Sequence, residues 1–304
     1  MEYFKQGLSL YEEVTNLICL RQEGSFWDFK KQWYTNKSDM LHDIICMSNN
    51  LSNRTAYIII GIDEQQDYSI VDVSCDPNRK NTQKLVDFLK DKKFAGGIRP
   101  VVHVESLHYC NGVIDTIVIE NSSNTPFYLT VQYEGVRASS IYTRVMDTNT
   151  PIDKSAGINH IEQLWRKRFH LDDTPIEKFR YYLRSPDDWN TIQDNNMGYF
   201  YKYSPEYTIT CEKDEPADGY EYYIFGQVNT NPSWWLITLR YHQTAIEQFQ
   251  GIALDGGRSF VIAPRRAYDL LNTGVSNFGF YIQNDLRCRL LEFYHRKETF
   301  EEYS

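Results

Sequence analysis

The chain has 304 residues, 41% of them hydrophobic and 15% aromatic, a composition typical of a folded protein and a length sufficient for two domains. Its formal net charge is −9, and residues 1–150 (15 basic, 19 acidic) and 151–304 (17 basic, 22 acidic) are both acidic. This argues against a broadly basic module that grips duplex DNA through many phosphates. It leaves open a local basic cleft, or a folded RNA held by a few lysines and arginines.

The distribution of cysteines and the hydropathy of the sequence indicate the cellular compartment of the protein. The six cysteines are scattered and none forms a C-x-x-C pair, which favours free thiols in a reducing environment. The first residues lack the apolar core of a signal peptide, and no window approaches eighteen apolar residues. We therefore expect a cytoplasmic protein without a membrane span.

The first half predicts an α+β domain over residues 1–150. Helical periodicity and turn residues indicate helices at 8–20, 38–48 and 81–93. Apolar and alternating runs indicate strands at 22–30, 56–60, 101–107 and 112–120.

The second half has a different character. Residues 151–174 are expected to link the halves through a helix at 158–169, and residues 175–304 to form a mainly antiparallel α+β domain of unknown role. Its expected strands are 198–203, 207–211, 220–228, 234–241, 245–254, 258–262 and 277–282. Its expected helices are 176–183, a short one from Pro264 through Leu271, and 285–300.

The acidic strand Gln22–Lys30 carries the strongest functional signal. Side chains alternate along a strand, so Asp28 and Lys30 share one face, which we expect to meet water. Glu23 precedes them, and Asp63 and Glu64 follow the apolar strand 56–60. If Glu23, Asp28 and one of Asp63 and Glu64 converge, they form a site for Mg²⁺ or Mn²⁺, and Lys30 meets a phosphate. The simpler interpretation is the solvated face of an amphipathic strand.

The order of motifs in this half resembles the Schlafen-type AlbA_2 domain. The motifs are Glu-x4-acid-Phe-Lys, a helix ending in Asn, an apolar strand and Gly-Ile-Asp-Glu, then Gly97–Pro100, Pro126–Tyr128 and Ser140–Val145. The chain departs from the family pattern at Asp28, where glutamate is commoner, at Arg54-Thr55, where two glycines are usual, and at Met146, where glycine is usual.

The resemblance implies a mixed sheet with helices and a metal-dependent endonuclease that acts on nucleic acid. Structured RNA such as tRNA is the implied substrate, in preference to DNA, and a role in antiviral defence or stress response is implied. In Schlafen nucleases two such lobes clamp the RNA, so a single copy suggests a homodimer or the second domain as the other jaw.

Basic residues near the acidic site and after it are the candidate nucleic-acid contacts. They are Lys30, Lys31, Arg99, Arg144, Arg166, Lys167 and Arg168. The triplet 166–168 ends a predicted helix, so its other interpretation is favourable placement of cations at a helix C-terminus.

Zinc and ATP are not expected as cofactors. His103, His108 and Cys110 lack a usual zinc spacing, and Glu105, Tyr128 and Leu129 stand where Schlafen zinc ligands would be. No phosphate-binding P-loop motif occurs in the sequence. The aromatic stretches 199–201, 220–223 and 234–235 suit either base stacking or a sheet core, and we favour the core.

Two other functions stay open from the sequence. One is a non-catalytic nucleic-acid-binding or regulatory module whose acids no longer act. The other is a protein-interaction subunit of a larger complex, in which the acidic surface and the aromatic second domain meet a partner protein.

Overall fold

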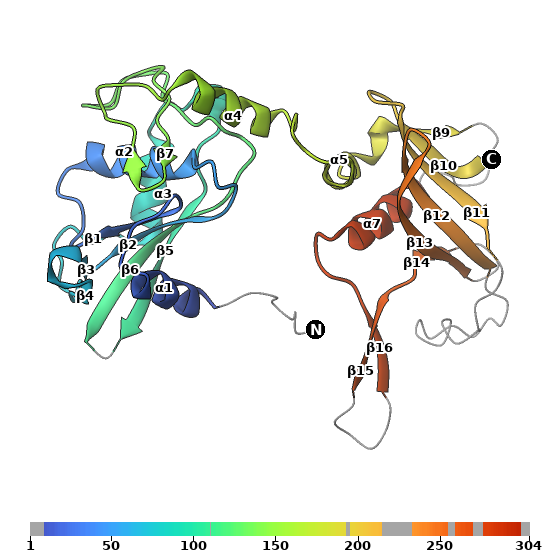
Figure 1. Ribbon diagram of the computed structural model, residues 1–304, viewed down its shortest axis with the longest axis horizontal. Coiled ribbons are helices and arrows are strands. Elements are labelled where there is room, and N and C mark those ends of the chain that lie inside the picture. Colours follow the sequence, from blue (N-terminus) through green and yellow to red (C-terminus); the bar gives the residue numbers. More distant parts are fainter. Residues whose placement is uncertain are drawn as a thin grey trace. The chain divides into compact units, whose positions relative to one another are not determined.

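The computed structural model describes residues 9–109, 111–192, 195–214, 233–254, 259–269 and 276–298. Contacts divide the chain into two compact units, Met1–Asp172 and Asp173–Ser304. Each unit combines helices with sheets, so the predicted α+β class is confirmed (Figure 1). Within these ranges no helix is long and apolar enough to cross a membrane.

The first unit is built around a four-stranded mixed sheet in the order β1-β2-β6-β5. β1 runs parallel to β2, and the other neighbours are antiparallel. Its strands are β1 (Trp27–Lys30), β2 (Ala56–Ile60), β5 (Val102–Tyr109) and β6 (Gly112–Ile119). Its helices are α1 (Leu10–Cys19), α2 (Lys37–Ser48), α3 (Thr82–Lys90) and α4 (Ile158–Arg168). Two short hairpins complete it: β3 (Ile62–Asp63) with β4 (Ser69–Ile70), and β7 (Arg144–Val145) with β8 (Thr148–Asn149).

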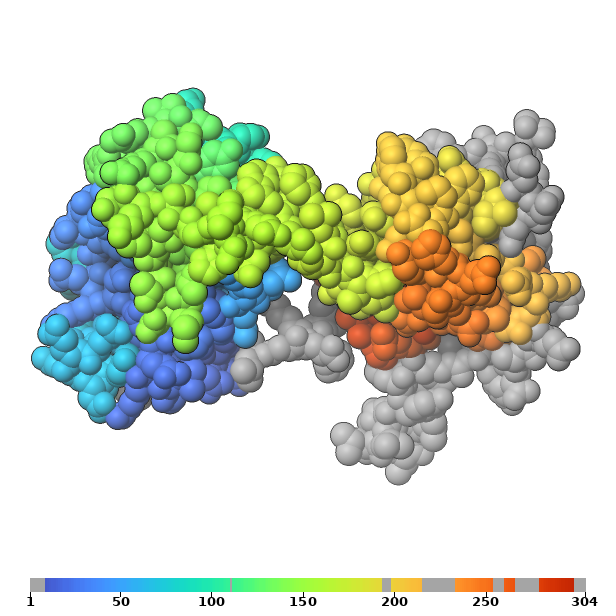
Figure 2. Space-filling view, turned by 45° about the horizontal axis from the view of Figure 1, so that its top comes forward, coloured from blue at the N-terminus to red at the C-terminus, as the bar shows by residue number. Residues whose placement is uncertain are grey.

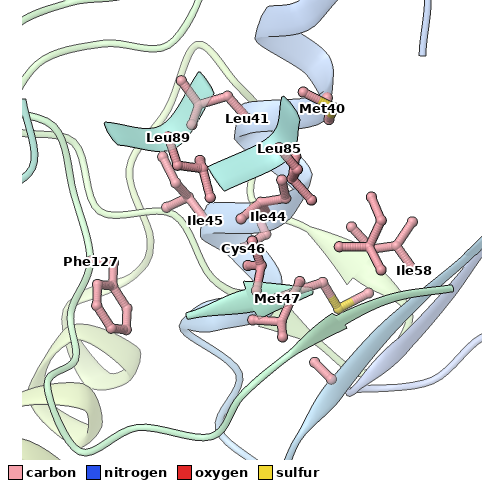
Figure 3. Close-up of a cluster of buried hydrophobic side chains, with 14 of the residues drawn as sticks. Met40, Leu41, Ile44, Ile45, Cys46, Met47, Ile58, Leu85, Leu89 and Phe127 are labelled. Atoms are coloured by element: carbon pink, nitrogen blue, oxygen red, sulfur yellow. The ribbon is translucent and has the colours of Figure 1, made fainter. Parts of the chain in front are cut away.

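Helices cover both faces of this sheet. α2 and α3 pack on one face, and their buried side chains form the main core (Figure 3). The core residues labelled there are Met40, Leu41, Ile44, Ile45, Cys46, Met47, Ile58, Leu85, Leu89 and Phe127. α1 packs on the other face, where Val14 and Leu17 meet Trp27, Phe29 and Ile59. The strand β1 therefore lies between α1 and α2, not at a water-facing surface.

Polar residues fix the ends of the first two helices. Ser9 and Glu12 form a reciprocal capping box at α1, and Asn36 accepts a hydrogen bond from the Ser38 amide at the start of α2. Asn49, at the end of α2, is fully buried. Its side-chain amide donates to the carbonyls of Phe127 and Tyr142, at 2.9 and 2.7 Å. This asparagine thereby ties α2 to the segment that enters β7, which carries Arg144.

The second unit contains a six-stranded antiparallel sheet in the order β14-β13-β12-β11-β10-β9. Its strands are β9 (Trp189–Ile192), β10 (Asn195–Tyr201), β11 (Tyr207–Lys213), β12 (Ser233–Tyr241), β13 (Thr244–Leu254) and β14 (Ser259–Ile262). The helices α5 (Pro175–Tyr182) and α7 (Leu286–Glu298) contribute to the core on one of its faces, through Phe179 and Phe293 among others. This arrangement agrees with the predicted antiparallel character of the half.

Aromatic side chains fill the core of the second unit. Tyr199, Tyr201 and Trp234 are buried, and the rings of Tyr182 and Tyr201 stack with centroids 4.0 Å apart. The core interpretation is thus confirmed for the described parts of the stretches 199–201 and 234–235. The stretch 220–223, and with it the expected strand 220–228, lies outside the described residues.

Within the described residues of the second unit, the helix predicted from Pro264 is wrong. The segment from Pro264 through Leu271 was expected as a helix, but Arg265–Asp269 is the strand β15, paired with β16 (Ser276–Phe280) in an antiparallel hairpin. A segment this short fits both periods, and pairing with a partner strand decides it.

Candidate active site

The candidate site lies on the α2 side of β1, where Asp28 and Lys30 alternate with the α1-facing Trp27 and Phe29. Asp28 is 2% exposed, because α2 and the β7–β8 hairpin cover this part of the strand. The expectation of a water-facing surface is therefore wrong for Asp28. Lys30 reaches further out, with its side chain 31% exposed.

Arg144 joins the two acids of the Glu-x4-Asp motif. Its Nη2 lies 2.8 Å from Glu23 Oε2 and 3.4 Å from Asp28 Oδ1. Its Nε donates to the Gly24 carbonyl at 2.7 Å. The guanidinium is buried, at 2% exposure, so it holds the carboxylates in place and is not free to meet a phosphate.

Lys30 joins Asp28 to a third carboxylate that the sequence reasoning missed. Its Nζ lies 2.5 Å from Asp28 Oδ2 and 3.5 Å from Asp43 Oδ2. Asp43 comes from α2 and its side chain is 13% exposed. Each of the two cations thus bridges two carboxylates.

Asn149 closes these contacts into a ring. Its side-chain oxygen accepts from Arg144 Nη1 at 3.0 Å, and its amide donates to Asp43 Oδ1 at 2.8 Å. Tyr34 donates its hydroxyl hydrogen to Asp43 Oδ2 at 2.7 Å. We call this set the charged cluster; it comprises Glu23, Asp28, Lys30, Tyr34, Asp43, Arg144 and Asn149.

Burial and the nearby negative charge of Asp28 shift the pKa of Glu23. Desolvation, followed by the hydrogen bond and the charge of nearby Asp28, raises the pKa of Glu23 to about 7. The Phe29 amide, which donates to Glu23 at 3.1 Å, and Arg144 act in the opposite direction. Glu23 is therefore a carboxyl group that titrates near neutral pH, as groups in functional sites often do.

The other members of the charged cluster are held in defined ionisation states. Burial alone would lower the pKa of Lys30, but the charges of Asp28 and Asp43 raise it. Burial alone would raise the pKa of Asp43, but the hydrogen bond with His42, the charge of Lys30 and the hydrogen bond from Tyr34 lower it. Lys30 is thus an ammonium and Asp43 a carboxylate at neutral pH.

The acids after β2 make contacts of their own. Asp63 Oδ2 pairs with Lys31 Nζ at 2.7 Å, and Asp63 accepts from the Gln65 amide at the start of a short 3₁₀ turn. Glu64 is exposed in that turn. Burial, followed by the charges of Glu64 and Glu23, raises the pKa of Tyr68. In the described chain it is Asp43, and not Asp63, that contacts Lys30.

Most of the predicted nucleic-acid contacts have partners inside their own unit. Arg166 pairs with Asp172, Lys167 donates to Asn121 at 2.8 Å, and Arg168 donates to the Asn124 carbonyl at 2.8 Å. Burial lowers the pKa of Lys167 to about 8. The triplet therefore suits its structural interpretation as the basic end of α4.

Three residues of the basic set are more accessible. Arg99 is exposed, Lys31 is 58% exposed while paired with Asp63, and Lys30 opens partly to solvent. Beside the cluster, a surface pocket is lined by residues of the segment 145–160, including Asn149, Lys154 and His160. This segment is coloured yellow-green on the face shown in Figure 2.

The donor chemistry of the cluster suits a hard divalent cation. Carboxylate oxygens are the ligands that Mg²⁺ and Mn²⁺ prefer, and Asp28 Oδ2 is buried without an aligned hydrogen bond. In the arrangement described, however, no three His, Cys, Asp or Glu side chains of these residues gather closely enough to share one ion. Lys30 and Arg144 lie against the carboxylates instead.

His103, on β5, lies close to an acid. His103 Nδ1 lies 3.6 Å from Glu120 Oε1, as an ordinary pair between neighbouring segments. Cys110 lies outside the described residues.

Sequence reasoning could have found Asp43 from one signal. Apolar residues fill positions 40–47 of α2 except for His42 and Asp43, and an acid inside such a stretch needs a partner. Tyr34 and Asn149 carry no comparable signal, because each lies in a segment that reads as a polar turn.

Comparison with known proteins identifies the fold family of this region. Residues 23–153 match the family model described as Schlafen, AlbA_2, so the resemblance inferred from the motifs is confirmed over that range. The matched range contains the whole charged cluster. The family implies a function related to nucleic acid in general. Neither the curated proteins nor the solved structures gave a match.

Proposed function

We propose that this Schlafen AlbA_2 domain binds nucleic acid and cleaves it as a metal-dependent endonuclease, with structured RNA such as tRNA as the preferred substrate. The observation that carries the proposal is the convergence of the acids Glu23 and Asp28 on the buried Arg144, which comes from the far end of the domain, with Lys30 beside Asp28. Acids and a cation brought together from distant segments are typical of a functional site.

The residues have separable roles in this proposal. Glu23, Asp28 and Asp43 would hold Mg²⁺ or Mn²⁺, which when bound stabilises charge on a phosphate and activates a water molecule. Lys30, which opens partly to solvent, would stabilise the charge that develops on the phosphate. Arg144 and Asn149 position the carboxylates.

The preference for RNA over long duplex DNA follows from charge. The protein carries a net charge of −9, and the basic triplet at the end of α4 is engaged with neighbouring residues. Few cations are left for a broad electrostatic footprint, which duplex binding requires. A folded RNA held by shape and a few contacts places less demand on charge.

The test is incubation of the full chain with total RNA and, separately, with DNA, each with Mg²⁺, Mn²⁺ or EDTA. Cleavage of RNA with either metal, lost in EDTA and in Asp28→Asn, is the expected result. Asp87→Asn is the matched control, because Asp87 is an exposed acid of α3 outside the cluster. Absence of cleavage in the wild-type protein with every substrate and both metals would contradict the proposal.

A second function is favoured by a specific observation. Every carboxylate of the cluster already contacts a protein cation, which is also what a non-catalytic binding module would show. In that case the wild-type protein would bind RNA and never cut it, and Asp28→Asn would bind equally well.

A homodimer would supply a second lobe for an RNA clamp. Light scattering of the full chain with and without tRNA tests this. A monomer in both conditions would contradict the homodimer. The second unit would then be the other jaw, or the protein would not clamp RNA.

A further inference from the structure

Lys30 occupies the space between two buried carboxylates. Its ammonium nitrogen lies 2.5 Å from Asp28 Oδ2 and 3.5 Å from Asp43 Oδ2. The side chains of Asp28 and Asp43 are 2% and 13% exposed, so solvent screens their charges weakly. A cation at this position is therefore required by the electrostatics of the pair, and here the protein supplies it.

Asp28 Oδ2 depends on this ammonium in particular. The oxygen is buried and accepts no aligned hydrogen bond in the described chain, and its close contact is the ion pair with Lys30. If Lys30 turned away, Arg144 would still face Asp28 Oδ1 at 3.4 Å, but the buried Oδ2 would lose its close cation, which is costly. A hard divalent ion is the species best suited to take that place, since both partners are carboxylate oxygens.

The side chain of Lys30 can turn toward solvent, whereas that of Arg144 cannot. Its side chain is 31% exposed, whereas Arg144 is 2% exposed and hydrogen-bonded to Gly24, Glu23 and Asn149. A lysine stem is flexible, and its ammonium gains hydration when it turns outward. The exchange of an ammonium for a metal ion is therefore a local side-chain movement.

We propose that Asp28 and Asp43 form the core of a divalent-cation site that Lys30 occupies in the metal-free protein, so that Lys30 and Mg²⁺ or Mn²⁺ compete for it. Asp43 takes the place that the sequence assigned to Asp63 or Glu64. The inference rests on the metal site of the proposed function, but it concerns occupancy of the carboxylates and holds whether or not RNA is cut.

The test measures metal binding alone, with Mn²⁺ titrated into the full chain and followed by electron paramagnetic resonance. Lys30→Met removes the competing ammonium and keeps the length of the side chain. The apparent dissociation constant is the intrinsic one divided by the fraction of molecules with a free site, so Lys30→Met should bind Mn²⁺ at least about tenfold more tightly than wild type. Asp43→Asn added to Lys30→Met should abolish the gain.

Lys31→Met is the matched control, because Lys31 is the next residue and pairs with Asp63 rather than with Asp28 or Asp43. It removes the same net charge, and its Mn²⁺ affinity should stay within about twofold of wild type, since exposed charges act weakly. An unchanged or weaker affinity in Lys30→Met would overturn the proposal. An equal gain in Lys31→Met would also overturn it, because the effect would then be one of net charge.

A measurement on the wild-type protein covers the case in which Lys30→Met does not fold. Mn²⁺ should raise the rate at which an amine-reactive reagent labels Lys30, read by mass spectrometry, while Lys31 labelling stays unchanged. If Mn²⁺ leaves Lys30 labelling unchanged or slows it, the ammonium is not displaced and the proposal fails. Loss of RNA cleavage with this exchange intact would count against the endonuclease alone.

Discussion

Arg144 and Glu23 lie 121 positions apart in the sequence, yet Arg144 Nη2 donates to Glu23 Oε2 at 2.8 Å. The same nitrogen contacts Asp28, so one buried guanidinium holds both acids of the motif. The Arg-Val pair that ends the domain is therefore part of the site and not only a boundary. Through this contact, a residue near the end of the matched region holds the residue at its beginning in place.

Replacement of Arg144 should destabilise the first unit strongly. Arg144→Ala removes the cation that contacts Glu23 and leaves Asp28 with Lys30 alone, and loss of one partner from a buried ion pair costs about 3–5 kcal/mol. Arg144→Lys should recover only part of this, because an ammonium cannot reproduce the forked contacts to Gly24, Glu23 and Asn149. Urea unfolding followed by tryptophan fluorescence gives both values.

Arg166→Ala is the control for this prediction. Arg166 pairs with Asp172, but both side chains are largely exposed, at 41% and 60%. Its loss should cost less than about 1 kcal/mol. If Arg144→Ala and Arg166→Ala were equally stable, Arg144 would be a surface arginine and the charged cluster would not exist as described.

Two conservative substitutions test whether Asp43, found in the structure, or Asp63, expected from the sequence, serves the site. Asp43→Asn and Asp63→Asn each remove one charge and keep the shape of the side chain. If cleavage occurs, Asp43→Asn should lower its rate about 10²–10³-fold, as loss of a preorganised charged group does, while Asp63→Asn should stay within about threefold of wild type. Gel quantification of RNA cleavage at saturating Mg²⁺ decides between them. The reverse order would restore the assignment of Asp63.

Only part of this site can be predicted from the sequence, because some of its contacts depend on how distant elements pack. The period of β1 correctly places Asp28 and Lys30 on one face, since alternation is a local property of a strand. Which element covers that face is not local. It depends on the parallel pairing of β1 with β2, which places α2 over Asp28 and so brings Asp43 to Lys30.

Asp63 illustrates the opposite case. It follows a buried strand, the usual position of a functional acid, and a rule based on strand ends selects it. The structure instead uses Asp63 to begin a 3₁₀ turn and to pair with Lys31. A carboxylate that caps a turn and one that serves a site have the same local pattern, so only tertiary contacts distinguish them.

A second buried network predicts an acid-sensitive contribution to stability. Asp115 is fully buried and accepts two hydrogen bonds from Arg79, at 2.7 and 2.8 Å, one from Trp33 Nε1 at 2.8 Å and one from Ser106 at 2.7 Å. Asp115→Asn should lower the free energy of unfolding by about 2–3 kcal/mol, because the Arg79 charge loses its partner.

The pH dependence of this difference has a definite sign. Burial alone would raise the pKa of Asp115, but the hydrogen bonds from Arg79, Ser106 and Trp33 hold it below its ordinary value. The carboxylate therefore contributes fully above that ordinary value, about 4, and its contribution is lost as the pH falls below it. Wild type and Asp115→Asn should differ constantly from about pH 7 to about pH 5 and converge below about pH 4. A constant difference down to about pH 2 would contradict the role given to Asp115.

The turn between β7 and β8 offers a stabilising substitution. Met146 has φ of 56°, in the left-handed region, and is 75% exposed, so its side chain gains little burial there. Glycine adopts this conformation without steric cost, and Met146→Gly should raise the free energy of unfolding by up to about 1 kcal/mol. Thermal unfolding measures the change, with Met146→Ala as the control that keeps the β-carbon and should show no gain. A destabilised Met146→Gly would mean that the Met146 side chain makes a favourable contact.

The salt dependence of RNA binding tests how many cations meet the substrate. Arg166, Lys167 and Arg168 have intramolecular partners, which leaves Lys30, Lys31 and Arg99 as the accessible cations of the predicted set. At about 0.7 per phosphate contact on single strands, up to three such contacts give a slope of log K against log salt of about −2. Lys31→Gln with Arg99→Gln should make the slope shallower by about 1 to 1.5, whereas Arg166→Gln with Arg168→Gln should leave it unchanged.

Fluorescence anisotropy with a labelled RNA in EDTA, where no cleavage interferes, gives these slopes. A wild-type slope near −8 would require a broad basic face, which neither the charge of this chain nor the contacts of its arginines supplies.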